Sequence, residues 1–201
     1  MTKKRRGRPR TYNPDAALSA ALNVFWEQGF SGSSLDDISA ATGMNRPSLY
    51  AAFGDKKSIY RKSLDRFSRE FLSGLEAALF AGVSLEDDLV NFYLAALSVY
   101  QSEKNAARGC PLICTATTEA ILDDDIQSDL ANSLDRIDLA LVTRFEQARE
   151  HGQLGQSAEP KQLGQLAAAM LHSLAVRVRA KQTGFDPEAF IRASVAEIFK
   201  T

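Results

Sequence analysis

The sequence predicts an all-helical protein of two domains, and three observations support this fold class. Apolar residues recur at intervals of three and four along most of the chain, which is the period of an amphipathic helix. The alternation of apolar and polar residues that marks a half-buried strand is not found. The chain has 201 residues, of which 45% are apolar, so it can bury a sizeable core.

The basic residues are distributed unevenly. Six of the 24 stand in the first ten positions, and these are Lys3, Lys4, Arg5, Arg6, Arg8 and Arg10. We expect residues 1–10 to form a disordered basic arm whose partner is an anionic polymer. Arg8-Pro9-Arg10 resembles the core of AT-hook motifs, whose extended arginines suit the minor groove of A·T-rich DNA. A solubilising tail is the alternative.

Composition also bears on location and cofactors. No apolar run approaches the roughly 20 residues of a membrane span, and no apolar signal segment follows the basic start, so a cytoplasmic protein is expected. Cys110 and Cys114 lack the histidine partners of a zinc site, and no metal or other cofactor is predicted. Near a helix start and Arg108, Cys110 is either a reactive thiolate or an apolar filler.

Residues 15–28 form the first predicted helix, with Gly29 at its end. Its buried stripe consists of Leu18, Ala21, Leu22 and Phe25.

The next stretch predicts two short helices joined by a tight turn. Ser34 can cap the first helix, and Asp37 stands three residues later, where a capping box places its acid. Gly43 ends that helix, because glycine reaches the left-handed backbone that a sharp turn needs. The second helix begins near Asn45, and Pro47 is tolerated in its first turn.

Apolar spacing orients these two helices. Leu35, Ile38 and Ala41 are expected on one face of the first, while Leu49 and Phe53 face inward from the second. Two short helices around a glycine turn form a helix-turn-helix, which places its second helix in the DNA major groove.

Residues 11–60 resemble the DNA-binding domain of TetR-type transcriptional regulators, and the run LYAAFGDKKSIY after the turn is the strongest part of the resemblance. Ser39 departs from the alanine usual in the family but is small enough to fit. The resemblance rests on Ala17, Leu22, Phe25, Gly29, Phe30, Ile38, Gly43, Leu49, Tyr50, Phe53, Lys56 and Tyr60.

The chemistry of the second short helix suggests how DNA would be read. Arg46 can donate two hydrogen bonds to guanine, Asn45 can bond adenine or a phosphate, and Pro47 can touch a thymine methyl. The family pattern implies phosphate contacts from Tyr50 and Lys56. Alternatively, Tyr50 is half-buried core and Arg46 is a solvated surface charge. The predicted DNA-binding residues are Arg8, Arg10, Ser34, Thr42, Asn45, Arg46, Pro47, Ser48, Tyr50 and Lys56.

The rest of the chain continues the helical period, and about nine helices in this order match the TetR architecture. The predicted domains are the arm 1–10, the helix-turn-helix domain 11–57 and a ligand-binding and dimerisation domain 58–201. The later helices are expected at residues 56–81, 85–100, 111–122, 126–148, 160–178 and 187–199.

The resemblance implies two roles for the second domain. One is a small-molecule effector site, with the predicted lining Phe67, Phe71, Phe92, Tyr93, Tyr100, Thr117, Phe145 and His172. The other is a homodimer interface on the last two helices, with the predicted contacts Leu163, Leu166, Ala167, Met170, Leu174, Val178, Phe190 and Ile198. Most of these residues could instead be ordinary core.

The sequence therefore predicts a homodimeric repressor that an effector releases from an inverted repeat in double-stranded DNA. One alternative is an architectural minor-groove binder that uses the arm alone. An enzyme is the other, although no nucleophile elbow, phosphate loop or metal cluster is present in the sequence.

Overall fold

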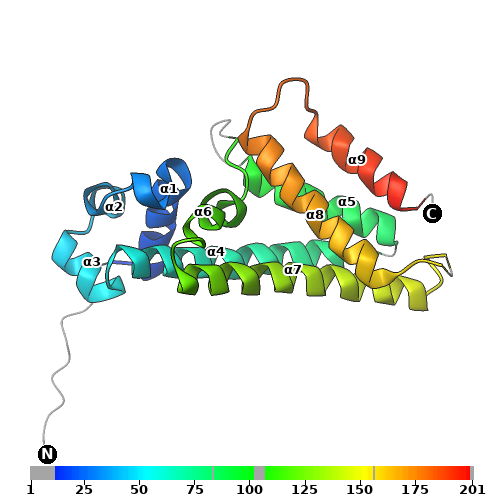
Figure 1. Ribbon diagram of the computed structural model, residues 1–201, viewed down its shortest axis with the longest axis horizontal. Helices are drawn as coiled ribbons and strands as arrows, with labels where there is room; N and C mark the ends of the chain where they lie inside the picture. The colour runs from blue at the N-terminus through cyan, green and yellow to red at the C-terminus, as the bar shows by residue number, and fades with distance from the viewer. Residues whose placement is uncertain (1–11, 83, 102–106, 156, 200–201) are drawn as a thin grey trace, which may run out of the picture. The chain divides into compact units, whose positions relative to one another are not determined.

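The computed structural model describes most of the chain as helix (Figure 1). Nine α-helices and one π-helical segment lie in the described part, which contains no strand. Within it, no helix combines the length and the apolar character needed to cross a membrane. The chain divides into two compact units, Met1–Ser63 and Leu64–Thr201. The described residues are 12–82, 84–101, 107–155 and 157–199.

The first unit contains three helices and the start of a fourth. These are α1 (Pro14–Gly32), α2 (Leu35–Thr42), α3 (Arg46–Phe53) and the first turns of α4 (Lys56–Leu79). Helix α1 begins one residue before the predicted start, because Asn13 accepts hydrogen bonds from the backbone N–H groups of Asp15 and Ala16. The backbone is non-helical at Gly29, where the predicted helix ends, and a further turn follows it.

The core of the first unit gathers side chains from all four helices. Phe25, Ile38, Leu49 and Tyr60 are each 0% exposed. The rings of Phe25 and Tyr60 meet edge to face, with centroids 4.9 Å apart. The start of α4 is thus part of this core, and the boundary between the units falls inside α4, six residues beyond the predicted one.

One position predicted to face this core does not. Ile38 is fully buried and Leu35 is half-buried, but Ala41 is exposed. Each three-residue step along an α-helix falls about 60° short of a full turn, so two steps carry Ala41 about 120° away from Leu35. The prediction for Ala41 was wrong for that reason.

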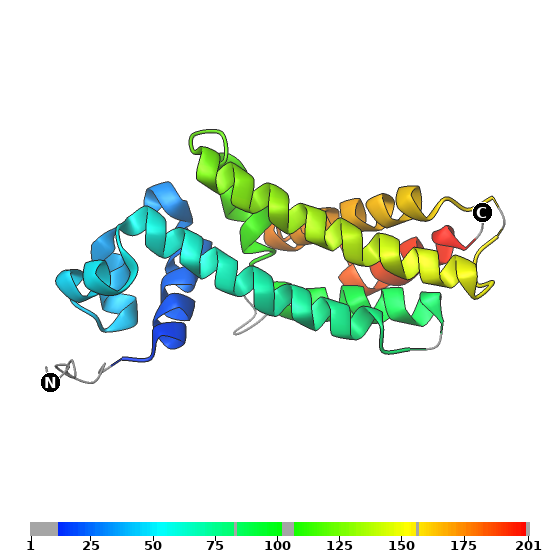
Figure 2. The same cartoon turned by 90° about the horizontal axis from the view of Figure 1, so that it is seen from below.

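The second unit contains the remainder of α4 and six further elements (Figures 1 and 2). Helix α7 packs along α8, and α5 packs against α8 and α9. Three helices of the second unit begin at a residue whose side chain caps them: Ser84 caps α5, Asp123 caps α7 and Asp186 caps α9. The six elements are α5 (Leu85–Tyr100), η1 (Leu112–Ala116), α6 (Thr117–Glu119), α7 (Asp124–Glu150), α8 (Pro160–Arg179) and α9 (Pro187–Ile198).

The helix predicted over residues 111–122 is replaced by η1 and the single turn α6. The Thr115 hydroxyl donates to the Pro111 carbonyl at 2.6 Å, and the Thr117 hydroxyl donates to the Ile113 carbonyl at 2.8 Å. Threonine hydroxyls that bond to carbonyls of the preceding turn compete with the regular backbone ladder. Residues 121 and 122, which were predicted helical, are in a turn.

Helices α7 and α8 approach closely at Gly164. A Cβ atom placed there would lie 2.7 Å from Val142 Cγ2 and 2.9 Å from the Val142 backbone nitrogen. We therefore expect Gly164→Ala to lower the free energy of unfolding by about 1–3 kcal/mol, because the backbone of α7 cannot yield as a side chain can. Chemical denaturation followed by circular dichroism measures this.

A matched control is Gly74→Ala in α4, where an added Cβ would meet nothing within 4 Å. That substitution should stabilise the protein by about 0.5–1 kcal/mol, since alanine is the better helix former. Equal effects of the two substitutions would contradict the close approach at Gly164.

Candidate nucleic-acid interface

The start of α2 is held by the predicted capping box. The backbone N–H of Asp37 donates to Ser34 Oγ at 3.2 Å, and the backbone N–H of Ser34 donates to Asp37 Oδ2 at 2.8 Å. The Ser34 hydroxyl and the Ser34 backbone N–H both donate to the Asp37 carboxyl, and these two hydrogen bonds hold the pKa of that carboxyl below its usual range. Gly43 follows α2 with φ 67°, in the left-handed region that the turn was predicted to need.

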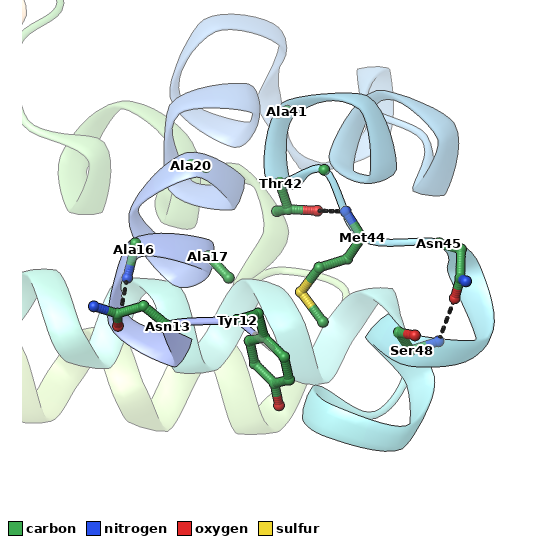
Figure 3. Close-up of a pocket in the computed structure, with 11 residues that line it drawn as sticks. Tyr12, Asn13, Ala16, Ala17, Ala20, Ala41, Thr42, Met44, Asn45 and Ser48 are labelled. Atoms are coloured by element: carbon green, nitrogen blue, oxygen red, sulfur yellow. Dashed lines mark hydrogen bonds between the residues drawn. The ribbon is translucent and has the colours of Figure 1, made fainter. Parts of the chain in front are cut away.

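The turn itself is braced by two hydroxyl groups. Ser39 Oγ donates to the Met44 carbonyl at 2.5 Å, and Thr42 Oγ1 donates to the Ile38 carbonyl at 2.7 Å. Thr42 Oγ1 also accepts from the Met44 backbone N–H at 3.3 Å (Figure 3). Ser39 therefore does more than fit the helix crossing, because it ties α2 to the start of the next helix.

Helix α3 divides cleanly into a buried and an exposed side. Leu49 and Phe53 are buried, as predicted. The Asn45 side-chain oxygen caps α3 by accepting from the Ser48 backbone N–H at 2.9 Å, which leaves its amide nitrogen to donate (Figure 3). Tyr50 is 51% exposed, so about half of its side chain is accessible to a partner. The exposed residues are Asn45, Arg46, Pro47, Ser48, Tyr50 and Ala51.

A hollow of about 550 Å³ lies beside the turn, between the starts of α1 and α3 (Figure 3). The predicted DNA-binding residues Thr42, Asn45 and Ser48 line it. Tyr12 and Asn13 line it too, and sequence reasoning missed both. The dipeptide Asn13-Pro14, a cap followed by proline in the first turn, was the signal that could have placed them at a helix start.

Three predicted phosphate contacts have structural roles of their own. The Ser34 hydroxyl donates to Asp37 Oδ2 at 2.6 Å, and the Thr42 hydroxyl donates within the turn as described above. Lys56 Nζ donates to the Ser33 carbonyl at 2.5 Å and lies 4.5 Å from the centroid of the Phe30 ring. An ammonium group has three N–H donors, so Lys56 can still meet a phosphate, whereas the Ser34 hydroxyl would have to give up its hydrogen bond to Asp37 Oδ2.

The charges of this surface are paired. Arg46 Nε donates to Asp36 Oδ1 at 2.7 Å, and Arg46 Nη2 donates to Asp36 Oδ2 at 2.5 Å. The hydrogen bond to Arg46 lowers the pKa of the Asp36 carboxyl, and the same bond raises the pKa of Arg46. The sequence predicted that Arg46 either contacts guanine or is a solvated charge. Neither prediction included its ion pair with Asp36. Arg8 and Arg10 of the predicted arm lie outside the described residues.

The aromatic residues predicted to line an effector site are buried in the second unit. The rings of Phe67 and Phe71 stack at 5.2 Å, and the Phe71 and Tyr100 rings lie 5.7 Å apart. Phe92, Tyr93 and Phe145 are each at most 1% exposed. The Tyr93 hydroxyl donates to the Ala167 carbonyl at 2.8 Å. Burial raises the pKa of Tyr93 and the pKa of Tyr100.

Two other residues of the predicted effector site do not lie in this aromatic interior. Thr117 is exposed and bonds back to its own turn, so it does not line a buried pocket. His172 lies on α8 in a separate groove of about 670 Å³, shared with Ser173, Val176 and Arg177. Burial lowers the pKa of His172, which favours its neutral form.

The residues predicted for the dimer interface fall into two groups. Leu174 and Val178 are at most 4% exposed and belong to the core of the subunit, so their placement at a surface was wrong. The others line an apolar groove of about 530 Å³ between α8 and α9, in which Leu166 is 59% exposed. Those groove residues are Leu163, Leu166, Ala167, Met170, Phe190 and Ile198, with Ala167 itself 0% exposed.

The two cysteines do not form a reactive centre of the kind that Arg108 suggested. Cys110 is 2% exposed, and burial raises the pKa of its thiol to about 12. Burial also raises the pKa of Cys114, although nearby Arg179 opposes the effect. Cys110 is therefore a protonated core residue. Among the described residues, no group of three or more His, Cys, Asp and Glu side chains is arranged to hold a metal ion.

Comparison with known proteins relates this fold to regulators of transcription. The family described as bacterial regulatory proteins, tetR family, matches residues 17–62. The HTH-type transcriptional repressor ComR of Escherichia coli K12 is 38% identical over 132 residues, which cover 66% of this chain and 61% of ComR. The repressor BdcR of the same organism is 39% identical over 82 residues, or 41% of this chain and 39% of BdcR. The matched region thus spans about three fifths of ComR and less of BdcR.

The fold extends the likeness over the second unit. A cysteine mutant of the TetR family transcriptional regulator CifR, solved with operator DNA, superposes with a TM-score of 0.82 over 96% of this chain and 99% of that chain. At 24% identity this likeness shows a shared fold. The helix-turn-helix of this chain, over residues 17–62, belongs to the tetR family of bacterial regulatory proteins, and the described fold as a whole is that of a TetR family transcriptional regulator.

Proposed function

We propose that this chain is a transcriptional repressor that binds an inverted-repeat operator in double-stranded DNA as a homodimer. The observation that carries the proposal is the exposed polar side of α3, held by a capped and braced turn in a family of DNA-binding regulators. Asn45, Arg46, Pro47 and Ser48 would enter the major groove, while Tyr50 and Lys56 would meet phosphates on either side. Such a regulator would act in the cytoplasm.

A single helix-turn-helix makes too few contacts for tight specific binding, so two subunits have to act together. The apolar groove between α8 and α9 supplies the surface, and we propose a second copy of the chain as its occupant. Leu163, Met170 and Phe190 are half-buried around the exposed Leu166. A symmetric contact of this patch with itself would bury all four side chains.

The same proposal includes a small-molecule effector that binds the second unit and lowers the affinity for DNA. The buried aromatic residues around Phe71 and Tyr100 offer an apolar environment with phenol groups for orientation. An effector acts this way only if it binds the DNA-incompetent form more tightly. A thermal-shift screen of small aromatic compounds, followed by DNA release as the readout, would identify it.

Selection of random duplexes with the purified chain tests the DNA-binding proposal directly. We expect an inverted repeat whose half-site centres are separated by about 34 Å or a multiple of that distance, and a footprint on both halves. Removing residues 1–10 should weaken binding and flatten its salt dependence, because six basic residues are lost, while the preferred repeat is retained.

The outcome of the deletion separates the two DNA-binding hypotheses. If all sequence preference disappeared with the arm, the architectural minor-groove hypothesis would replace the helix-turn-helix one. An absence of any selected sequence with the full chain would contradict both. We propose no catalytic activity, since the related proteins are regulators.

A further inference from the structure

The ion pair between Asp36 and Arg46 joins the two helices of the helix-turn-helix across its outer surface. Asp36 is the second residue of α2, and Arg46 is the first residue of α3. The Asp36 and Arg46 side chains are 71% and 55% exposed, so burial does not force them together. A carboxylate at a surface that would face DNA phosphates should be unfavourable unless it has a role there.

The geometry of the pair leaves one edge of the guanidinium group open. Asp36 accepts from Nε and from Nη2 of Arg46, which form the side edge of the planar fork. The two N–H groups at the far end, on Nη1 and Nη2, point away from that carboxylate. A guanine base accepts bidentate hydrogen bonds at O6 and N7 from this end of an arginine.

We propose that Asp36 is a positioning residue that aims Arg46 at one guanine in each operator half-site. The proposal rests on the proposed DNA binding and adds to it the residue that sets one base preference. Arg46 has a long side chain with many rotamers. If Asp36 holds the guanidinium group in place before DNA binds, less side-chain entropy is lost when Arg46 contacts the base. The carboxylate then holds the arginine along the edge of the guanidinium group next to the end that meets the base.

Other roles for Asp36 are less consistent with these contacts. The capping of α2 is carried by Ser34 and Asp37, so Asp36 is not the acid of the capping box. Within the described residues, both hydrogen bonds of the Asp36 carboxylate go to Arg46. Exposed ion pairs typically contribute about 1 kcal/mol or less to stability, so a purely stabilising role would account for little of this contact.

The test compares base preferences of Asp36→Asn, Arg46→Ala and the double variant on the duplexes that the parent selects. If Asp36 aims Arg46, each single variant should lose about 10-fold of its preference for the same guanine, and the double variant should lose little more. The matched control is Glu27→Gln, which removes the same charge from an exposed position on α1 and should leave every base preference unchanged. Circular dichroism verifies that each variant is folded.

Two results would overturn the inference while leaving the proposed function intact. Asp36→Asn could bind all duplexes more tightly with the guanine preference unchanged, which would make Asp36 a repelling charge only. Asp36→Asn or Arg46→Ala could also keep the parent's preference at every position. Failure of the parent chain to select any sequence would instead reject the proposed function itself, so the two failures are distinguishable.

Discussion

Asp88→Ala should lower the free energy of unfolding by about 3–5 kcal/mol, because it leaves a buried arginine without its carboxylate. Arg144 is 6% exposed, and its Nε donates to Asp88 Oδ2 at 2.8 Å. Asp88 is 1% exposed and also accepts from the Gly82 backbone N–H at 2.6 Å. For a chain of this length, the expected loss corresponds to a fall in Tm of roughly 6–20 °C.

The network around this pair explains the size of the expected effect. Gln153 Oε1 accepts from the Leu85 backbone N–H at 3.0 Å and lies 3.4 Å from Arg144 Nη2. These hydrogen bonds join Gly82 and the first turn of α5 to Arg144 of α7 and to Gln153, which follows α7. Loss of the carboxylate would strand the Gly82 N–H as well as the guanidinium group.

Urea denaturation at a fixed protein concentration measures the change, since the stability of the proposed dimer would depend on concentration. The control is Asp65→Ala, which breaks the exposed pair of Asp65 with Arg69 on α4 and should cost about 1 kcal/mol or less. The double variant Asp88→Leu with Arg144→Met removes both charges and should recover much of the loss. Equal losses of unfolding free energy for Asp88→Ala and Asp65→Ala would show that the buried ion pair stabilises the protein no more than the exposed one.

Local features of the fold could be predicted from the sequence, and the reason is that their causes are local. Ser34, Asp37 and Gly43 determine the start and end of α2 through contacts within a few residues. The apolar period predicted a helix over residues 85–100, and α5 has those bounds, with Leu89, Phe92 and Tyr100 among its buried side chains. Such features depend on backbone geometry and on spacing, which the sequence displays directly.

Contacts between distant residues could not be predicted in this way. Asp88 and Arg144 are 56 positions apart, and neither stands in a pattern that marks it as paired. Asp36 and Arg46 are only ten positions apart, but their contact depends on the angle between two helices. The residues of α3 proposed to meet DNA are exposed, as predicted, while the carboxylate that holds Arg46 was missed.

The apolar stripe of α8 illustrates the same limit. An apolar period predicts that a helix face is buried but does not say whether the same chain or another covers it. Leu174 and Val178 are covered by their own subunit, whereas Leu166 remains exposed. The packing of α8 against α5, α7, η1 and α9 separates these two groups, and the sequence does not display it.

Leu166→Glu should convert the protein to a monomer and lower its affinity for the inverted repeat by about 10²- to 10⁴-fold. Leu166 is 59% exposed in the apolar groove between α8 and α9, so a glutamate there costs the isolated subunit little. In a symmetric dimer the same substitution would bury two like charges against apolar surface, at a cost that few interfaces tolerate. Sedimentation velocity and operator titration measure the two effects on one preparation.

The control is Ile121→Glu, an equivalent change at a residue that is 82% exposed at the junction of α6 and α7, outside the groove. It should leave both the dimer and operator binding unchanged. If Leu166→Glu stayed dimeric and bound the repeat like the parent, the groove would not be the interface, and the two recognition helices would have to be joined elsewhere. A monomer that kept full affinity would contradict the proposed dimeric binding itself, because one helix-turn-helix would then be enough for tight binding.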